Sequence, residues 1–316
     1  MADPVPAASS ADPRDALGPP PLGPRQWPVW LGVGVAALLA RLPWPLQRRL
    51  GRGLGALLRG LLRERRRVAE RNLALCFPEL DAAARQALLR DSFAELGVGL
   101  FEFARAWWGS VAPMRAGLRV EGLEHLQRAQ AAGRGVIIVS GHFVTLELSA
   151  RLMCDHAPLA GMYRPHDTGA MEWAVKRGRL RYAAAMFTRE ELRPALKHLK
   201  QGGLLWFAPD QDTRRGDSVY VPFFGRPADS LTSTHQLARL SGAAVLGFAH
   251  VRRDDGGYTL RLTPAFDGFP GRDATADTAR VMAAIEDMVR AAPAQYLWIH
   301  KRFKRQPDLP DGALYR

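Results

Sequence analysis

The stretch that decides the fold is Gly135-Val-Ile-Ile-Val-Ser-Gly-His-Phe-Val-Thr-Leu-Glu147. It begins with a short β-branched run, Val136 to Val139, bounded by glycines, and such a run is typical of a buried strand. The chain then turns through Ser140 and Gly141 into a stretch, ending near Leu152, that we expect to be helical. Strand, turn and helix in this order form the unit from which α/β folds are built.

Two further apolar runs repeat the pattern, at residues 203–208 and 243–248. We expect helices at the intervening residues: 170–181, 190–200 and 233–240. Strands that alternate with helices predict an α/β fold with a largely parallel mixed sheet flanked by helices. In such sheets ligands bind beyond the carboxyl ends of the strands. His142 and Asp210 each follow a predicted strand end, so we expect them to converge on one cleft.

Four residues separate the imidazole of His142 from the carboxylate of Glu147. On one continuous helix the two side chains would point about 140° apart and would not meet. They can meet if His142 lies in the turn and Glu147 in the first turns of the helix. Glu147 would then hold one ring N–H, and the other nitrogen would take a proton from a hydroxyl. We predict that Glu147→Ala loses most turnover in a protein that stays folded.

The N-terminal region predicts a disordered tail over residues 1–25 and a membrane-associated segment over residues 26–63. Residues 27–40 form an uncharged apolar run with interfacial tryptophans, which favours a retained membrane-anchoring helix. The run is shorter than the roughly 20 residues that span a bilayer, so a marginal span and insertion into one leaflet both stay open. Residues 46–62 follow as a basic amphipathic helix of the kind that lies on an anionic membrane. Residues 64–316 remain for a catalytic domain.

The composition describes a folded, strongly basic chain, with 47% hydrophobic residues and a formal charge of +13. This surplus implies contact with an anionic partner, although a solvated basic helix face is the alternative explanation. Arginines beside the apolar run favour a cytoplasmic placement next to anionic lipid. They are Arg48, Arg49, Arg52, Arg59, Arg63, Arg65, Arg66 and Arg67. The two cysteines, Cys76 and Cys154, have no metal-ligand spacing and are expected to be buried rather than nucleophilic.

Several ordered blocks resemble the late acyltransferases of lipid A biosynthesis in Gram-negative bacteria, within the lysophospholipid acyltransferase superfamily. The hallmark of that family is a histidine followed after four residues by an acidic residue, as at His142 and Glu147. The other blocks are Arg71-Asn-Leu-Ala-Leu-Cys-Phe-Pro-Glu-Leu80, Met162-Tyr-Arg-Pro165, Gly178-Arg-Leu-Arg181, Ala208-Pro-Asp-Gln-Asp212, Val221-Pro-Phe-Phe224 and Tyr296-Leu-Trp-Ile-His-Lys-Arg-Phe303. They run in order over nearly the whole chain.

The resemblance implies a bacterial inner-membrane enzyme that acts on the cytoplasmic face in lipopolysaccharide biosynthesis. It would move an acyl chain from acyl carrier protein directly to a hydroxyl of a phosphorylated glycolipid, a lipid A precursor. No covalent enzyme intermediate, metal or cofactor is expected. A different membrane glycolipid or a phospholipid is the alternative acceptor. A basic surface suits an acidic carrier protein, and electrostatic steering toward it would weaken with salt.

The resemblance also assigns roles to individual residues. His142 resembles the general base and Glu147 its acidic partner. Six further residues are implied as substrate contacts: Arg164, Arg179, Arg181, Asp210, Gln211 and Asp212. A guanidinium at position 164 suits a phosphate or a developing oxyanion, and those at 179 and 181 either contact phosphate or keep a helix soluble. An aspartate at a strand end can also cap a helix or pair with an arginine.

Two other functions compete with acyl transfer. A serine hydrolase would use Ser140 with His142 and Glu147, but the chain has no Gly-x-Ser-x-Gly elbow. A basic protein that binds a membrane surface or nucleic acid would need no enzyme site. The sequence carries no recognisable nucleic-acid-binding motif, so we expect no nucleic-acid partner.

Overall fold

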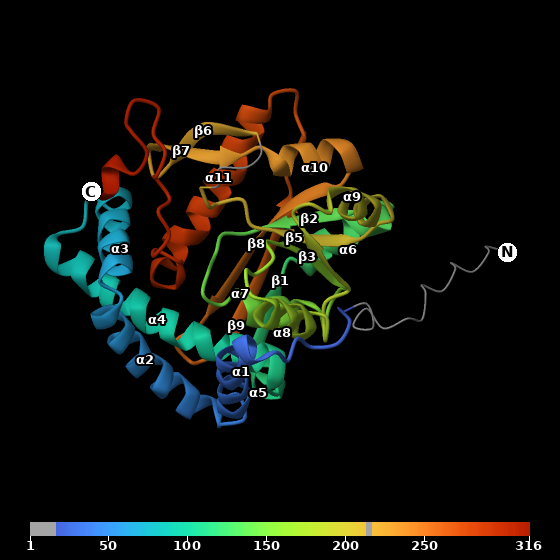
Figure 1. The fold of residues 1–316 in the computed structure, drawn as a ribbon. Helices are drawn as coiled ribbons and strands as arrows, with labels where there is room; N and C mark the ends of the chain where they lie inside the picture. Colours follow the sequence, from blue (N-terminus) through green and yellow to red (C-terminus); the bar gives the residue numbers. More distant parts are fainter. Residues whose placement is uncertain (1–16, 213–216) are drawn as a thin grey trace.

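The computed structural model describes residues 17–212 and 217–316 (Figure 1). Its centre is a seven-stranded sheet in the order β1-β9-β8-β2-β5-β3-β4. Only the β8–β9 pair in this sheet is antiparallel, so the predicted largely parallel mixed sheet is confirmed. The seven strands are β1 (Leu118–Glu121), β2 (Val136–Val139), β3 (Leu159–Tyr163), β4 (Ala185–Thr188), β5 (Leu204–Phe207), β8 (Ala244–Arg252) and β9 (Tyr258–Ala265). A separate hairpin pairs β6 (Ser218–Phe223) with β7 (Arg226–Leu231).

Helices cover both faces of the sheet (Figure 1). They are α1 (Trp27–Leu39), α2 (Trp44–Leu61), α3 (Arg63–Cys76), α4 (Ala82–Trp108), α5 (Ala112–Ala116), α6 (Leu123–Ala131), α7 (Leu146–Met153), α8 (Gly169–Arg179), α9 (Leu192–Lys200), α10 (Ser233–Ser241) and α11 (Ala274–Ala291). Short 3-10 turns occur at Pro24–Gln26, Pro293–Gln295 and Ala313–Tyr315. The helices expected at residues 170–181, 190–200 and 233–240 are α8, α9 and α10.

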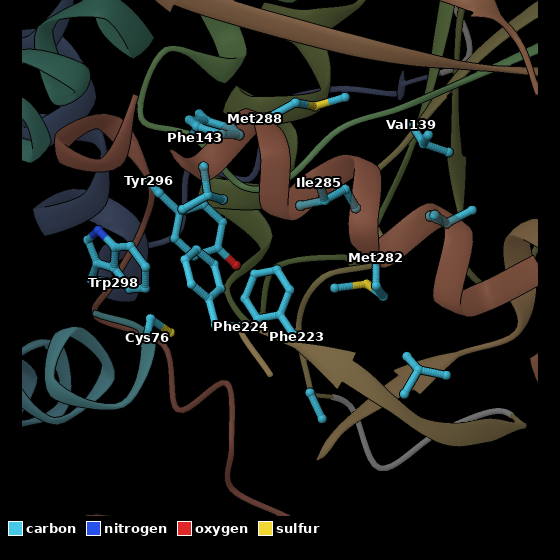
Figure 2. Packing of buried hydrophobic residues seen from close by; sticks show 14 of the residues in the cluster. Cys76, Val139, Phe143, Phe223, Phe224, Met282, Ile285, Met288, Tyr296 and Trp298 are labelled. Atoms are coloured by element: carbon cyan, nitrogen blue, oxygen red, sulfur yellow. The ribbon is translucent and has the colours of Figure 1, made fainter. Parts of the chain in front are cut away.

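Strand β2 is buried on both sides because its alternate residues enter two different cores. Ile137 and Val139 belong to the core that contains Ile285 and Met288 of α11, part of which Figure 2 shows. Val136 and Ile138 belong to the core beneath α4 and α7. The strand expected from the β-branched run is therefore the central strand that leads to His142.

Helix α2 makes its closest approach to α4 at glycines, while Leu54 and Leu58 are partly buried beside them. An added Cβ at Gly55 would lie 2.0 Å from the carbonyl oxygen of Phe93, and one at Gly97 would lie 2.0 Å from that of Gly51. These contacts let the two backbones approach closely, and they leave the leucine stripe of α2 exposed. The stripe consists of Leu46, Leu50, Leu57 and Leu61. The amphipathic helix is thus present, with its leucines directed away from the protein.

The predicted membrane-anchoring helix is present as a helix, but its role as an anchor is not supported. Helix α1 covers 13 residues and packs on α4 and α8. Within residues 17–212 and 217–316, no helix has both the length and the apolar character needed to cross a membrane. The predicted transmembrane helix is therefore unsupported.

The described part of the predicted disordered tail is attached to the fold. The indole N–H of Trp30 donates to the carbonyl of Pro21 at 2.7 Å, and that of Trp173 donates to the carbonyl of Gly18 at 3.1 Å. Residues 17–25 therefore run along α1 and α8. Residues 1–16 of the tail lie outside the described part of the chain.

Candidate active site

His142 lies in the turn between β2 and α7, as expected, and it is paired with Asp210. Its Nδ1 lies 2.6 Å from Oδ1 of Asp210, and its backbone N–H donates to Oδ2 at 2.9 Å. Asp210 follows β5, the parallel neighbour of β2, so the two strand ends bring these residues together. The prediction that His142 and Asp210 converge is confirmed.

The C-terminal segment braces this turn. The backbone N–H of Leu297 donates to the carbonyl of His142 at 2.9 Å, and the hydroxyl of Tyr296 donates to Oδ2 of Asp210 at 2.8 Å. The ring of Tyr296 packs edge-on against Phe143 at 5.5 Å between centroids, and Figure 2 shows both beside α11. Tyr296 begins one of the blocks that resemble the family, but nothing in the sequence linked it to His142.

The electrostatics of the pair suit a base. Complete burial alone would raise the pKa of Asp210, but the facing imidazole and the hydrogen bonds from His142 and Tyr296 hold that pKa well below its usual range. Asp210 is therefore ionised, and it favours the tautomer of His142 that carries the proton on Nδ1. Nε2 is then left as a proton acceptor on a ring whose side chain is 29% exposed.

The prediction that Glu147 orients the ring is wrong. Glu147 is in the first turn of α7, as expected, but its carboxylate is buried and turned toward α4 and α8. Arg179 donates to Oε1 through Nε at 3.0 Å and through Nη2. Trp107 Nε1 and the hydroxyl of Tyr182 donate to Oε2 at 2.8 and 3.1 Å. The ring N–H of His142 that Glu147 was expected to hold is bonded to Asp210 instead.

A cavity of ≈ 310 Å³ opens beside His142. Its lining combines His142, Glu147 and Arg164 with an apolar wall. That wall includes Phe103, Leu146, Ala150, Leu159, Ala160, Gly161, Met162, Ala183, Met186, Trp206 and Phe207. An apolar cavity with a few polar groups at one end is the usual form of a small-molecule or lipid site.

The remaining predicted contacts are distributed unevenly around this cavity. Arg164 lies on its rim, exposed and 3.0 Å from Asp167. Arg179 also lines it, but its guanidinium is committed to Glu147. Arg181 is directed elsewhere, with Nη1 donating to the carbonyl of Trp107.

The two residues after Asp210 do not line the cavity. Asp212 is nearly buried and accepts from Nε of Arg305 at 2.9 Å, which is the arginine-pairing alternative left open for this block. Gln211 is half-buried. Neither side chain reaches the proton-accepting side of His142 in this arrangement.

The serine alternative is unfavourable here. Ser140 is fully buried, donates to the carbonyl of Gly141 at 3.1 Å and lies 2.9 Å from Nε2 of His250. The cysteines also lack nucleophilic character, because burial raises the pKa of the Cys76 thiol and raises that of Cys154 to about 12. The imidazole of His142, by contrast, lines the cavity.

His250 joins the two ends of the catalytic turn, and no sequence signal pointed to it. Its Nε2 lies 2.9 Å from the hydroxyl of Ser140 and its Nδ1 lies 2.9 Å from the hydroxyl of Thr145. Burial, with a smaller effect from His142, lowers the pKa of His250 to about 3. The ring is therefore neutral and acts as a fixed bridge below the turn.

Removing this bridge should disturb both catalysis and the pH dependence of stability. We expect His250→Gln to lower kcat by roughly 10- to 100-fold, since small displacements of a catalytic group cost that much. Because the pKa of His250 falls from 6.5 on folding, wild-type stability decreases as pH drops from 6.5 toward 3. Denaturant titrations over this range should show a smaller decrease in the variant. If the free energy of unfolding depended on pH equally in the two proteins, the assignment of His250 as a buried, neutral bridge would be wrong.

A histidine beside a cavity with a mostly apolar wall, at the carboxyl edge of a parallel sheet, suits an enzyme that acts on a substrate with a long apolar group. Acyl transfer to a hydroxyl is one reaction that such a site can support.

Comparisons with known proteins agree with this class. A family described as bacterial lipid A biosynthesis acyltransferase matches residues 20–305. The chain is 42% identical to the lipid A biosynthesis palmitoleoyltransferase of Escherichia coli strain K12, over 93% of this chain and 96% of that protein. It is 39% identical to the lipid A biosynthesis lauroyltransferase of the same strain, over 91% and 94%. The chain belongs to the lipid A biosynthesis acyltransferase family, and it is an acyltransferase.

A more distant similarity exists among solved structures. The 1-acyl-sn-glycerophosphate acyltransferase PlsC from Thermotoga maritima superposes with a TM-score of 0.38 at 16% identity, over 80% of this chain and 99% of that one. The match is too loose to assign residues.

Proposed function

We propose that this enzyme transfers a fatty acyl chain from acyl carrier protein to a hydroxyl of a phosphorylated glycolipid, a precursor of lipid A. The observation that carries the proposal is the His142–Asp210 pair, whose imidazole lines a cavity with a mostly apolar wall. The apolar wall suits an acyl chain, and the formal charge of +13 suits an acidic carrier protein and an anionic lipid surface. The reaction would take place at the cytoplasmic face of the bacterial inner membrane.

In the proposed mechanism, Nε2 of His142 takes the proton from the acceptor hydroxyl while the oxygen attacks the thioester carbonyl. The ionised Asp210 stabilises the imidazolium that forms. The tetrahedral intermediate then collapses, the C–S bond breaks, and the leaving thiolate takes the proton back from the imidazolium. Arg164 on the rim is the proposed partner of the oxyanion or of a substrate phosphate. No bond to the enzyme forms at any step.

The leucine stripe of α2 is the proposed contact with the membrane. Leu46, Leu50, Leu57 and Leu61 are exposed, as are Trp27, Leu31 and Leu38 of α1. Arg49 and Arg52 are exposed on the same helix as the stripe. Apolar side chains beside arginines favour an interface with anionic lipid, where each charge near the surface contributes about 1 kcal/mol.

Mass spectrometry of lipid A tests the proposal. Cells that lack this protein should lose one secondary acyl chain, and the wild-type gene should restore a chain of defined mass. His142→Ala should not restore it although the protein accumulates normally. If lipid A is unchanged in the deletion strain and the purified protein acylates another lipid in vitro, that lipid is the acceptor instead.

The depth of the cavity should set the length of the acyl chain. A Cβ at Gly161 would lie 3.1 Å from Cε and 3.2 Å from Sδ of Met186, the flexible end of a side chain that lines the cavity. Gly161→Ala should therefore push Met186 into the cavity and shift the preference between donors toward shorter chains by about tenfold. Competition between acyl donors of different length measures the shift. Gly53→Ala, at a position with open space around it, is the matched control.

A further inference from the structure

A second cavity, of ≈ 290 Å³, lies on the other side of α8 from the catalytic cavity. It is lined by Trp30 and Val33 of α1, Trp108 of α4, Trp173, Ala174, Arg177 and Gly178 of α8, and Arg181. Tryptophan and arginine dominate this lining, and none of the described residues that form it is acidic. The cavity is therefore both aromatic and cationic.

The arginines of the second cavity are available to a ligand. Arg177 is exposed and lies over the ring of Trp173 at 5.0 Å, with no acidic partner among the described residues. Arg181 is also exposed, and within the part of the chain that the structure describes its guanidinium has one hydrogen bond, from Nη1 to the carbonyl of Trp107. Arg179, between them in the sequence, points to the other side and is neutralised by Glu147. Helix α8 and the residues directly after it thus place Arg179 in the lining of the first cavity and Arg177 and Arg181 in the lining of the second.

The indoles present ring surfaces rather than N–H groups. The N–H groups of Trp30 and Trp173 are bonded to backbone carbonyls of residues 17–25, and the two rings meet edge-on at 5.6 Å. Aromatic faces pack against the apolar faces of sugar rings, while guanidinium groups bind phosphate in a forked geometry. A phosphorylated sugar combines the two features that this lining recognises.

Trp107 contacts residues that line each of the two cavities. Trp107 donates from Nε1 to Glu147 on the catalytic side and accepts from Arg181 through its carbonyl on the other side. Its ring packs so closely on α8 that a Cβ at Gly178 would lie 2.7 Å from Cγ. Trp107 therefore links Arg181 of the second cavity to Glu147 of the first through two hydrogen bonds.

We propose that the second cavity binds the phosphorylated sugar of the acceptor while the acceptor hydroxyl lies at His142. This inference rests on the proposed function, because it assigns one end of the same acceptor. It makes Arg177, with Trp173 beneath it, a determinant of acceptor affinity that takes no part in proton transfer.

Steady-state kinetics with two acceptors tests the assignment. With the phosphorylated acceptor, Arg177→Gln should raise KM about tenfold and leave kcat unchanged. With the same acceptor after removal of its phosphates, the variant and wild type should have the same KM. Arg128→Gln removes an equal charge from an exposed position of α6 that lines neither cavity, and it should change nothing.

The outcomes separate this inference from the proposed function. If the wild type transfers no acyl chain to the glycolipid, the proposed function itself fails. If the wild type is active and Arg177→Gln has the wild-type KM for the phosphorylated acceptor, the phosphosugar assignment is overturned. It is also overturned if the KM of Arg177→Gln rises equally for the phosphorylated and the dephosphorylated acceptor. Weaker binding of the variant to vesicles containing phosphatidylglycerol, with an unchanged acceptor KM, would also overturn it and would assign the cavity to a bulk lipid headgroup.

Discussion

Replacing Asp210 with asparagine should lower kcat by about 10²- to 10⁴-fold, the range that general base catalysis contributes. The carboxylate accepts from Nδ1 and from the backbone N–H of His142, and it is fully buried. An amide of nearly the same shape can turn its NH₂ toward Nδ1, which favours the tautomer with the proton on Nε2. That tautomer cannot accept the hydroxyl proton. Single-turnover rates with a saturating acyl donor measure the loss directly.

Tyr296→Phe is the matched control for this variant. It removes one hydrogen bond from Asp210 but leaves both contacts between Asp210 and His142 in place. Its kcat should fall only a fewfold, and its Tm should stay close to that of Asp210→Asn. A wild-type rate in Asp210→Asn, or an equal loss in both variants, would show that Asp210 does not hold the base in its reactive tautomer.

The turn position of His142 and the proximity of Asp210 could be predicted from the sequence, whereas the choice of Asp210 over Glu147 as the partner of the imidazole could not. A β-branched run before Ser140 and Gly141 marks the end of a central strand, and parallel strands place their carboxyl ends together, so Asp210 was expected nearby. Spacing alone made Glu147 the orienting residue. Residues distant in the sequence determine that Glu147 does not contact His142, because Arg179 and Trp107 donate hydrogen bonds to its carboxylate. Hydrophobic patterns do not encode such competition between donors.

The N-terminal helices show a similar limit. Leucines and arginines at helical spacing correctly indicated the amphipathic helix over residues 46–62, observed as α2. The pattern did not show which face meets the protein. Gly51, Gly55 and Gly97 decide that, because only backbones without side chains can approach as α2 and α4 do. A glycine contributes nothing to hydrophobic periodicity, so the sequence pattern could not predict that this face of α2 packs on α4.

Glu147→Ala should reduce stability by about 3–5 kcal/mol, the usual cost of leaving a buried charge without its partner. The guanidinium of Arg179 would lose its counterion, and the donors of Trp107 and Tyr182 would lose their acceptor. This replaces the earlier expectation of a folded protein that lacks turnover. Thermal and denaturant unfolding of the purified variant measure the loss, and a large decrease in Tm should accompany any decrease in activity.

The double variant Glu147→Ala with Arg179→Met separates a structural role of Glu147 from a chemical one. Removing both charges leaves no uncompensated ion in the wall, so most of the lost stability should return. If Glu147 acts only by holding α7 against α4 and α8, transfer by the double variant should recover together with its Tm. A Glu147→Ala protein with the wild-type Tm but little activity would contradict this. Glu147 would then act on the substrate itself, from the cavity wall that it shares with His142.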